Sequence, residues 1–448
     1  MKSLVSILFL SLSISTLAKN PKLLAGPMQG HTTHNSTAVW ILVQHTQLAI
    51  VTVKDVNTGS ILTIEKLASE SKTINGKTPF TFQFYGLQPE HVYKVSIILD
   101  SQVVSADRVI KTFSNEPGRN WSFSVGSCAF IPPHGLRWIQ PGIEERTFKY
   151  MTAIPSDFMV WTGDYLYFLG KDHKSYKGMF NKYVETRTRK KMEAFVESRP
   201  QYAIWDDHEF GPNNACGDFS GKNDALDVWT KFWPSPAYGT DSLKGIFYSF
   251  KHLDGEFFMT DGRFYRTEPD EKTPLMFGDK QMKWLENKLL ASTATFKFIA
   301  IGSQVLNKMN KKDCFQHFKS EEEELLKFIA DNKITGVIFL TGDMHYSEII
   351  KLDRPGAYPL YDFTCSGITS FPFKVTRSEQ KNNPQRVPGM VYDSQNNGRI
   401  SISGPVGNRQ CTMEVFDKRG KLKFSYNVSE KDLQYPGAPS MMQPVKNN

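Results

Sequence analysis

The stretch 201–214, QYAIWDDHEFGPNN, decides how the rest of this chain can be arranged. It opens with an apolar run at 202–205 that predicts a buried strand. The run ends abruptly in the polar residues 206–209, DDHE, and a turn follows at 211–214, GPNN. Three carboxylates and an imidazole at the end of an apolar strand are unfavourable unless a cation offsets their charge. Taken alone, the stretch fits either a solvated turn with a helix cap or one wall of a cation site.

Three more apolar runs end in reactive side chains, as the first one does. They are 121–130 (WSFSVGSCAF, with Cys128), 157–168 (DFMVWTGDYLYF, with Asp164 and Tyr167) and 337–348 (VIFLTGDMHYSE, with Asp343 and His345). A glycine directly before the acid, as in the last two runs, lets the backbone approach closely. Ligands of layered α/β folds gather at the carboxyl ends of strands. The repetition therefore predicts that these ends face one way and form one site.

The side chains at these strand ends form a ligand set for several metal ions. Carboxylates can bridge two cations, imidazole suits transition metals, and a thiolate or phenolate needs a strong Lewis acid. Two or more cations would clamp a phosphoryl oxygen and hold a deprotonated water in line for attack. His208 or His345 could then stabilise the charge or protonate the departing oxygen. The residues thus predict a metal-dependent phosphoesterase.

The order of strand and helix patterns predicts an α/β fold of two units in this chain of 448 residues. Residues 20–116 carry short strand-like runs and predict a small all-β domain of the fibronectin or immunoglobulin-like kind. Tyr93 has the position of the tyrosine at a sandwich corner. From 117 to 432, buried strands alternate with helical patterns, which predicts a layered sandwich of mixed sheets flanked by helices. Residues 433–448, with three prolines, predict a loose tail.

Several elements of the second unit can be predicted individually. Helices are expected at 185–198, at 279–291 and at 320–332, the last opened by a capping box of Ser320 and Glu323. The runs 399–403 and 411–428 are expected as edge strands, the second folded as a hairpin.

The first residues predict export. Lys2 precedes an apolar stretch at 4–17, and Thr16-Leu17-Ala18 forms a small-x-small cleavage site. Residues 1–18 are therefore expected to be a signal peptide, and the mature protein to be periplasmic, secreted or at the cell surface. The apolar stretch is short for a membrane span, and no later segment is apolar enough for one, so we expect no integral membrane protein.

The net charge indicates which partners to expect, and the number of cysteines limits how they can pair. The formal net charge is +8, which suits an anionic substrate, and the dispersed basic residues predict no specific nucleic-acid partner. Five cysteines leave one thiol over after any complete pairing, and whether Cys216, Cys314, Cys365 and Cys411 pair is left open. Cys216 is expected to be a structural thiol or part of a disulfide. No Gly-x-Ser-x-Gly elbow supports a serine hydrolase.

The motifs GSCAF, WTGDYLY, WDDHEFGPNN and TGDMHYSE, in this order and spacing, resemble the alkaline phosphatase D (PhoD-like) family of metallophosphatases. The resemblance spans nearly the whole chain, including the β domain and DGRFYR at 261–266. It implies a multi-metal centre of ferric iron and calcium that hydrolyses phosphate mono- or diesters. The metal ligands that it implies are Cys128, Asp164, Tyr167, Asp206, Asp207, Asn213, Asp343 and His345.

The resemblance also implies roles within this set. Cys128 and Tyr167 would ligate the iron, and Asp164 would bridge. The catalytic residues would be Asp207, His345 and His208, with His208 facing the substrate phosphate.

Some assignments have two readings. Asp206 is either a ligand or a group that supports the ligands, and either Asn213 or Asn214 turns inward. Arg263 and Arg266 either bind the phosphate or form structural salt bridges. The remaining histidines considered, which are expected to be surface or core residues, are His134, His173, His252 and His317.

One rival function belongs to another class. A binding protein could combine a surface- or carbohydrate-binding β sandwich with a degenerate phosphatase domain. Such a protein would be poor in metal. The oligomeric state expected for the enzyme is a monomer.

Overall fold

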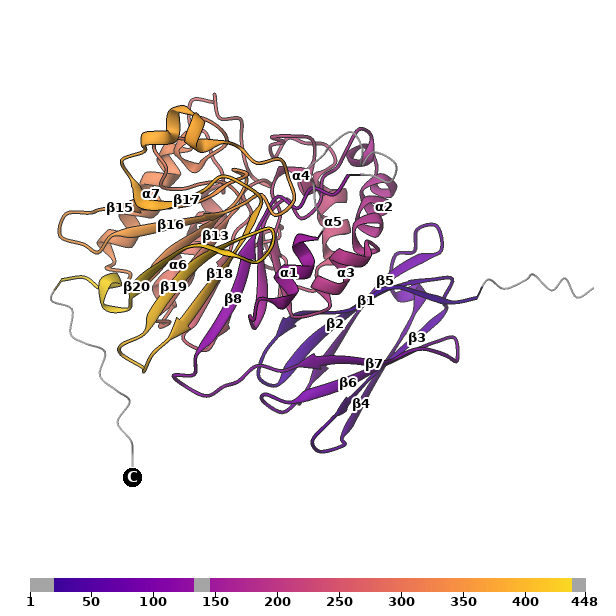
Figure 1. The fold of residues 1–448 in the computed structure, drawn as a ribbon. Helices are drawn as coiled ribbons and strands as arrows, with labels where there is room; N and C mark the ends of the chain where they lie inside the picture. The colour runs from indigo at the N-terminus through magenta and orange to yellow at the C-terminus, as the bar shows by residue number, and fades with distance from the viewer. Residues whose placement is uncertain (1–19, 133–145, 437–448) are drawn as a thin grey trace, which may run out of the picture.

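Strands at the front of the chain form a two-sheet sandwich in this computed structural model, which describes residues 20–132 and 146–436 (Figure 1). The elements are β1 Lys22–Thr32, β2 Ser36–Gln44, β3 Leu48–Asp55, β4 Ile61–Leu67, η1 Ala68–Glu70, β5 Lys77–Tyr85, β6 Val92–Leu99 and β7 Gln102–Lys111. One sheet has the order β1-β2-β5 and the other β4-β3-β6-β7. The expected all-β domain is confirmed.

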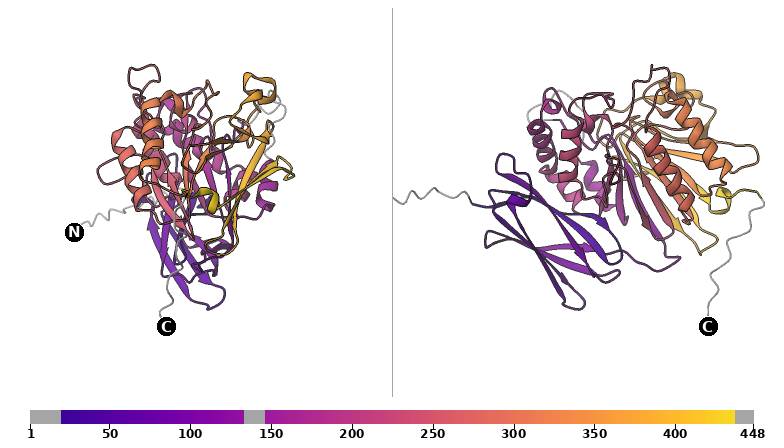
Figure 2. Two further views of the ribbon diagram at one scale, coloured as in Figure 1. Left: turned by 90° about the vertical axis from the view of Figure 1, so that its left-hand side faces the viewer. Right: turned by 180° about the vertical axis from the view of Figure 1, so that it is seen from behind.

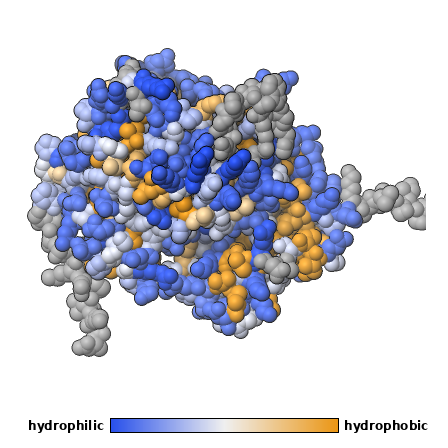
Figure 3. Space-filling view, viewed as in Figure 1, coloured by the Kyte–Doolittle hydropathy of each residue, from blue (hydrophilic) through white to orange (hydrophobic). Residues whose placement is uncertain are grey.

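The sandwich has a core of its own, and alternating residues such as Val51, Val53, Val95 and Ile97 fill it. The hydroxyl of Tyr93 accepts a hydrogen bond from the Gln88 N–H at 2.7 Å, as a sandwich corner requires. Figure 3 shows further hydrophobic residues on the surface of this unit. These exposed side chains include Ile61, Leu67, Val103 and Val109.

β1 is not predicted from the sequence, because Gly26, Pro27 and Gly30 interrupt its apolar pattern. It nevertheless pairs with β2 through irregular register and joins the sandwich to the second unit. The His31 N–H donates to the Pro234 carbonyl at 2.9 Å, and the Thr32 N–H donates to the Tyr202 hydroxyl at 3.0 Å. The sandwich is thereby fixed to the strand that leads into the DDHE motif.

Two mixed sheets form the second unit. The strands are β8 Trp121–Gly126, β9 Phe158–Thr162, β10 Gln201–Ile204, β11 Tyr248–His252, β12 Gly255–Met259, β13 Phe296–Ile301, β14 Val337–Thr341, β15 Ser347–Leu352, β16 Leu360–Cys365, β17 Arg386–Tyr392, β18 Asn396–Ser403, β19 Gln410–Asp417 and β20 Leu422–Ser429. The first sheet has the order β10-β9-β8-β18-β19-β20 and the second β11-β12-β13-β14-β16-β15-β17. Their facing aromatic side chains interlock, with the Phe123 ring 5.0 Å from Phe257 and 5.1 Å from Phe298. The layered sandwich is confirmed.

Helices flank this sandwich (Figure 2). They are α1 Thr147–Ala153, η2 Asp172–Lys174, α2 Tyr176–Arg187, α3 Lys190–Val196, α4 Asp207–Phe210, α5 Lys222–Phe232, α6 Asp279–Ala291, η3 Phe315–His317, α7 Lys319–Asp331, η4 Val375–Arg377, η5 Glu379–Asn382 and η6 Lys431–Leu433. In the described chain, no helix has the length and apolar character needed to cross a membrane.

The strand directions bring the four predicted strand ends to one edge. β8, β9 and β10 are parallel neighbours in the first sheet, and β12, β13, β14 and β16 are parallel neighbours in the second. The carboxyl ends of β8, β9, β10 and β14 therefore meet where the sheets face each other.

Three predictions for single elements are wrong. The helix expected at 185–198 is divided, because Arg189 has extended backbone (ψ 110°) and buries its guanidinium against the Pro132 carbonyl. The capping box at Ser320 does not form, because η3 leads directly into α7, whose N-cap is Phe318. The run 399–403 belongs to β18, which lies between β8 and β19, and is no edge strand. Its polar side chains are satisfied in the sheet, as the Arg399 pair with Glu414 at 2.8 Å illustrates.

Candidate metal centre

Four of the predicted ligands have left-handed backbone. The φ angles are 56° at Cys128, 54° at Asp164, 64° at Asp343 and 59° at His345. Side chains other than glycine adopt this region at a cost, and such residues concentrate at functional sites. Each of the four follows a strand end, so the sharp turn aims its side chain across the sheet edge. The four left-handed residues therefore indicate that this sheet edge is a functional site.

The two sheets lie close together at Gly342. A Cβ atom at this position would lie 2.5 Å from the Thr162 carbonyl and 2.7 Å from the Ser127 hydroxyl. Any side chain here would push β14 away from β8 and β9. The glycine of the Gly-Asp motif therefore permits the ligands of both sheets to converge.

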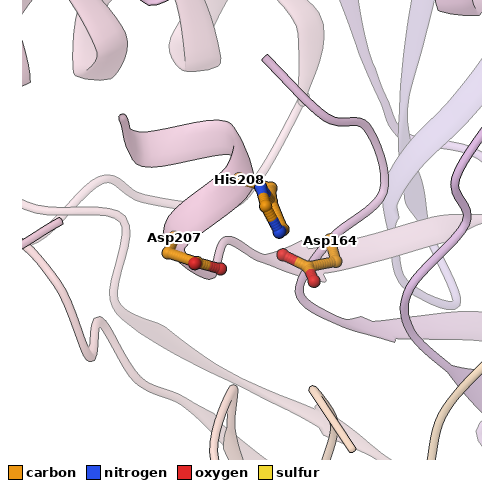
Figure 4. Close-up of side chains that lie close together, drawn as sticks. All are labelled: Asp164, Asp207 and His208. Atoms are coloured by element: carbon orange, nitrogen blue, oxygen red, sulfur yellow. The ribbon is translucent and has the colours of Figure 1, made fainter. Parts of the chain in front are cut away.

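Asp164, Asp207 and His208 form the centre of the cluster (Figure 4). One ligand atom from each lies within 4.8 Å of the other two. Asp164 follows β9, and the other two open the short helix α4 after β10. Residues that are more than 40 positions apart in the sequence thus present carboxylate and imidazole ligands to the same point.

Cys128 and Tyr167 extend this cluster through Asp164. The Cys128 thiol lies 3.4 Å from Asp164 Oδ2, and the Tyr167 hydroxyl lies 3.1 Å from the same oxygen. The Tyr167 ring packs on the His208 ring with 4.0 Å between their centroids. Burial and the charge of Asp164 raise the pKa of the Cys128 thiol and of the Tyr167 phenol well above their ordinary values. Both groups would ionise only beside a strong positive charge.

Among the predicted ligands, three buried carboxylate oxygens have no hydrogen-bond partner in the described part of the chain, namely Asp164 Oδ1, Asp206 Oδ2 and Asp207 Oδ1. Burial raises the pKa of Asp164 well above its ordinary value and that of Asp206 to about 7, and Asp207 adds to both shifts. Buried acceptors without donors are unfavourable in a protein interior. Cations would supply the missing partners, so the residues present fit a metal centre.

Asp343 and His345 bring the second sheet to the same place. Burial raises the pKa of Asp343, and Asp206 is the largest charged contributor. His345 Nδ1 lies 2.8 Å from the Phe371 carbonyl, which fixes Nδ1 as the protonated nitrogen and leaves Nε2 as the ligand atom. Its backbone N–H donates to the Ser366 hydroxyl at 2.8 Å, and that hydroxyl donates to the Cys128 sulfur at 3.2 Å.

Arg263 and Arg266 form buried salt bridges, the second of the two predicted alternatives. Arg263 donates to Asp206 Oδ1 at 2.7 Å and to Asp313 Oδ2 at 2.5 Å, and its side chain is 1% exposed. Arg266 contacts the other Asp313 oxygen and lies over the Phe318 ring. Neither guanidinium is open to a substrate. Asp206 keeps one oxygen on Arg263 and one unpaired, so its role as ligand or support stays a prediction.

The turn after α4 reaches the ligand cluster through its backbone. Asn213 and Asn214 are both exposed. The turn contacts the predicted ligands through the Asn214 N–H, which donates a hydrogen bond to Asp207 Oδ2 at 2.7 Å. The assignment of Asn213 as a ligand stays a prediction.

Among the described residues, the group formed by Asp164, Asp207 and His208 includes no further histidine or cysteine. His252 is buried against the rings of Phe113, Trp121 and Phe158, as a core histidine would be. His173 lies in η2 and His317 in η3, and His134 is outside the described residues. All five cysteines are free and buried, and the Cys216 thiol donates to the Thr267 carbonyl at 3.4 Å.

Glu209 is the functional residue that sequence reasoning missed. Its Oε2 accepts the N–H of Asp164 at 2.9 Å and that of Asp206 at 3.1 Å, and its Oε1 accepts those of Tyr165 and Leu166. One carboxylate therefore joins the end of β9 to the start of α4. The spacing from Asp206 to Glu209, three residues as in a capping box, is the signal that could have revealed it.

Comparisons with known proteins agree with this geometry. The model of the PhoD-like phosphatase family matches residues 124–414. Alkaline phosphatase D of Bacillus subtilis (strain 168) is 22% identical over 318 residues, which cover 58% of this chain and 52% of that protein. The chain thus spans about half the length of this curated relative.

Two solved structures have the same fold. The structure of PhoD covers 90% of this chain and 91% of its own, with a TM-score of 0.71 and 17% identity. The purple acid phosphatase PPD1 from yellow lupin (Lupinus luteus) seeds covers 92% of this chain and 75% of its own, with a TM-score of 0.63 and 14% identity. Because the family model matches more than half of the chain and includes all four strand-end motifs, the protein belongs to the PhoD-like phosphatase family.

Proposed function

We propose that this protein is an exported, metal-dependent phosphoesterase that hydrolyses phosphate mono- or diesters. The observation that carries the proposal is the meeting of three unpaired buried carboxylate oxygens, on Asp164, Asp206 and Asp207, beside a thiol, a phenol and an imidazole. The family supports the reaction class. A site of this composition is favourable only when cations occupy it.

The donor types suggest how metals would be divided between the ligands. Cys128 and Tyr167 would hold a ferric ion, since a thiolate and a phenolate need a strong Lewis acid, and Asp164 would be shared. Asp207, Asp343 and the other oxygen donors would suit calcium. Bound metals would polarise the phosphoryl oxygens and lower the pKa of a bound water. The identities of iron and calcium are part of the proposal.

His208 would act on the phosphate directly. Burial lowers its pKa, so the imidazole is neutral at pH 7 and carries one N–H. Packing against Tyr167 fixes the plane of its ring beside Asp207. In this position His208 would donate its one N–H as a hydrogen bond to a phosphate oxygen and stabilise the charge that develops there.

The setting of the reaction is also proposed. Residues 1–18 would direct export and be removed, and the mature enzyme would act outside the cytoplasm as a monomer. The net charge of +8 favours anionic substrates.

The test is an assay of purified protein with a known metal content. Activity on 4-nitrophenyl phosphate or bis(4-nitrophenyl) phosphate that disappears with a chelator and returns with metal is the expected result. A metal-loaded sample that cleaves neither ester would refute the proposal. A protein isolated without metal, and unable to take it up, would instead favour the rival binding protein with a degenerate site.

A further inference from the structure

None of the predicted metal ligands is among the residues that line a hollow of about 390 Å³. It is lined by Phe371, Tyr392, Gln395, Asp417, Lys418 and Arg419, with two further residues. These residues come from the loop after β16, the turn between β17 and β18, and the turn between β19 and β20.

The sheet order places this hollow at the edge that carries the metal ligands. β18 pairs with β8, and its first residue, Asn396, pairs with Asp417 at the end of β19. Because β18 runs antiparallel to β8, the turns before β18 and after β19 lie at the carboxyl end of β8 (Figure 1). Two strand spacings of roughly 5 Å put the β19–β20 turn about 10 Å along the edge from Cys128.

Direct hydrogen bonds connect the hollow to the metal ligands. The Gln395 side chain donates to the Thr369 carbonyl at 3.0 Å, and the Thr369 N–H donates to the Cys128 carbonyl at 3.4 Å. The Phe371 carbonyl accepts a hydrogen bond from His345 Nδ1, and Phe371 as a whole is 48% exposed and lines the hollow. Phe371 therefore belongs to both places, since its backbone contacts the ligand and the residue lines the hollow.

The turn between β19 and β20 places an exposed cation, Arg419, at the hollow. Asp417 is occupied by its own turn, since its Oδ1 accepts the N–H groups of Arg419 and Lys421 and its Oδ2 lies 3.7 Å from Lys423 Nζ. Arg419 is exposed, and no acidic side chain in the described part of the chain pairs with its guanidinium. Lys418 precedes Arg419 in the chain, and its backbone N–H donates a hydrogen bond to the Gln395 carbonyl.

Two aromatic residues also line the hollow, Phe371 and Tyr392. Phe371 is exposed, and the Tyr392 ring has Lys423 Nζ 4.9 Å from its centroid. Rings and cations together suit a group that has a flat or apolar face and a negative charge. An isolated inorganic phosphate would use only the cations.

We propose that this hollow is the leaving-group subsite, and that it selects phosphodiesters whose leaving alcohol carries an apolar face and an anionic group. The inference rests on the proposed phosphoesterase activity. Hydrolysis of such a diester consumes one water, breaks the bond between phosphorus and the leaving oxygen, and releases a phosphate monoester and the protonated alcohol. Arg419 would bind the anion, and Phe371 and Tyr392 would contact the apolar face.

The test compares two substrates that differ by one carboxylate on the leaving group, methyl 4-nitrophenyl phosphate and methyl 3-carboxy-4-nitrophenyl phosphate. The readout is the ratio of their kcat/KM values in the metal-loaded enzyme, after correction for the pKa of the leaving phenol. We expect the wild-type protein to prefer the carboxylate about three- to fivefold, as one partly exposed ion pair would produce. The preference should fade in 1 M salt.

Arg419→Glu should invert the ratio, and Arg419→Ala should bring it close to one. Lys54→Glu, which makes the same change of net charge on the exposed side chain of a strand in the sandwich, should leave the ratio unchanged. Equal ratios in the wild-type protein and Arg419→Glu would overturn the subsite while leaving the phosphoesterase intact. If the wild-type enzyme cleaves neither these diesters nor 4-nitrophenyl phosphate, the proposed function itself fails.

Discussion

The Glu209 carboxylate accepts the backbone N–H of Asp164 at 2.9 Å and so fixes a left-handed residue that carries a predicted ligand. Both of its oxygens are fully used, by donors from Asp164, Tyr165, Leu166 and Asp206. The two strand ends therefore keep their relative position through one buried side chain, and the metal ligands depend on it.

Glu209→Gln should lower the metal content of the purified protein severalfold. The amide has one acceptor oxygen and one NH2 group, so two backbone N–H groups would face a donor instead of an acceptor. Leaving buried donors unpaired costs about 1–3 kcal/mol. The measurement is the metal-to-protein ratio from elemental analysis, together with the thermal unfolding temperature.

Glu321→Gln is the matched control. Glu321 is 2% exposed and accepts three backbone N–H groups, from Met276, Phe277 and Gly278, but it holds no predicted ligand. It should lose similar stability and keep its metal. Equal loss of metal in both variants would show that Glu209 acts on overall stability only.

Cys128→Ala should remove the most tightly held metal, because it deletes the single thiol beside Asp164 and Tyr167. The equivalent change in the core, Cys411→Ala, alters a thiol that is likewise 0% exposed but lies within β19. Iron stoichiometry should fall in the first variant and stay unchanged in the second. Retention of iron by Cys128→Ala would exclude the thiol as a ligand.

Arg263→Met should destabilise the fold by about 3–5 kcal/mol, since it leaves Asp206 buried without its counter-ion and Asp313 with Arg266 alone. Urea unfolding of the metal-free protein measures this free energy. Arg399→Met, which breaks the partly exposed pair with Glu414, should cost about 1 kcal/mol or less. A higher KM with unchanged stability in Arg263→Met would point instead to a substrate-binding arginine.

His252→Phe should weaken the acid sensitivity of the fold. Burial lowers the pKa of His252 to about 3 from an ordinary value of 6.5. Between these values the unfolded chain binds a proton that the folded chain does not, so the free energy of unfolding falls as the pH is lowered. This residue contributes a slope of at most about 1.4 kcal/mol per pH unit.

Unfolding midpoints from pH 7 down to pH 4 would show the difference. Part of the slope should survive in the variant, because burial also lowers the pKa of His31, to about 4. Identical slopes in both proteins would show that His252 is protonated in the folded state at these pH values.

The sequence by itself determined the strands that carry the candidate site and the kinds of side chain that follow them. Short apolar runs bounded by glycine and acid predicted β8, β9, β10 and β14, because burial on both faces leaves an unbroken apolar pattern. The helix at 279–291 was predicted to the residue. The alternation of strands and helices was enough for the layered fold, since those patterns are local.

Only the tertiary structure decided which partner each polar side chain contacts. Arg263 and Arg266 could equally have bound phosphate or carboxylate, and the choice depends on Asp313, a residue 50 positions away from Arg263. In the sequence, Glu209 is only the last polar residue of the DDHE motif. The structure shows that its carboxylate accepts backbone N–H groups from the residues that follow β9. Contacts of this kind join distant segments, and their energies depend on burial and geometry that no local pattern contains. The sequence of the stretch 201–214 therefore specified which chemical groups are present, and the fold of the whole chain specified the partner of each group.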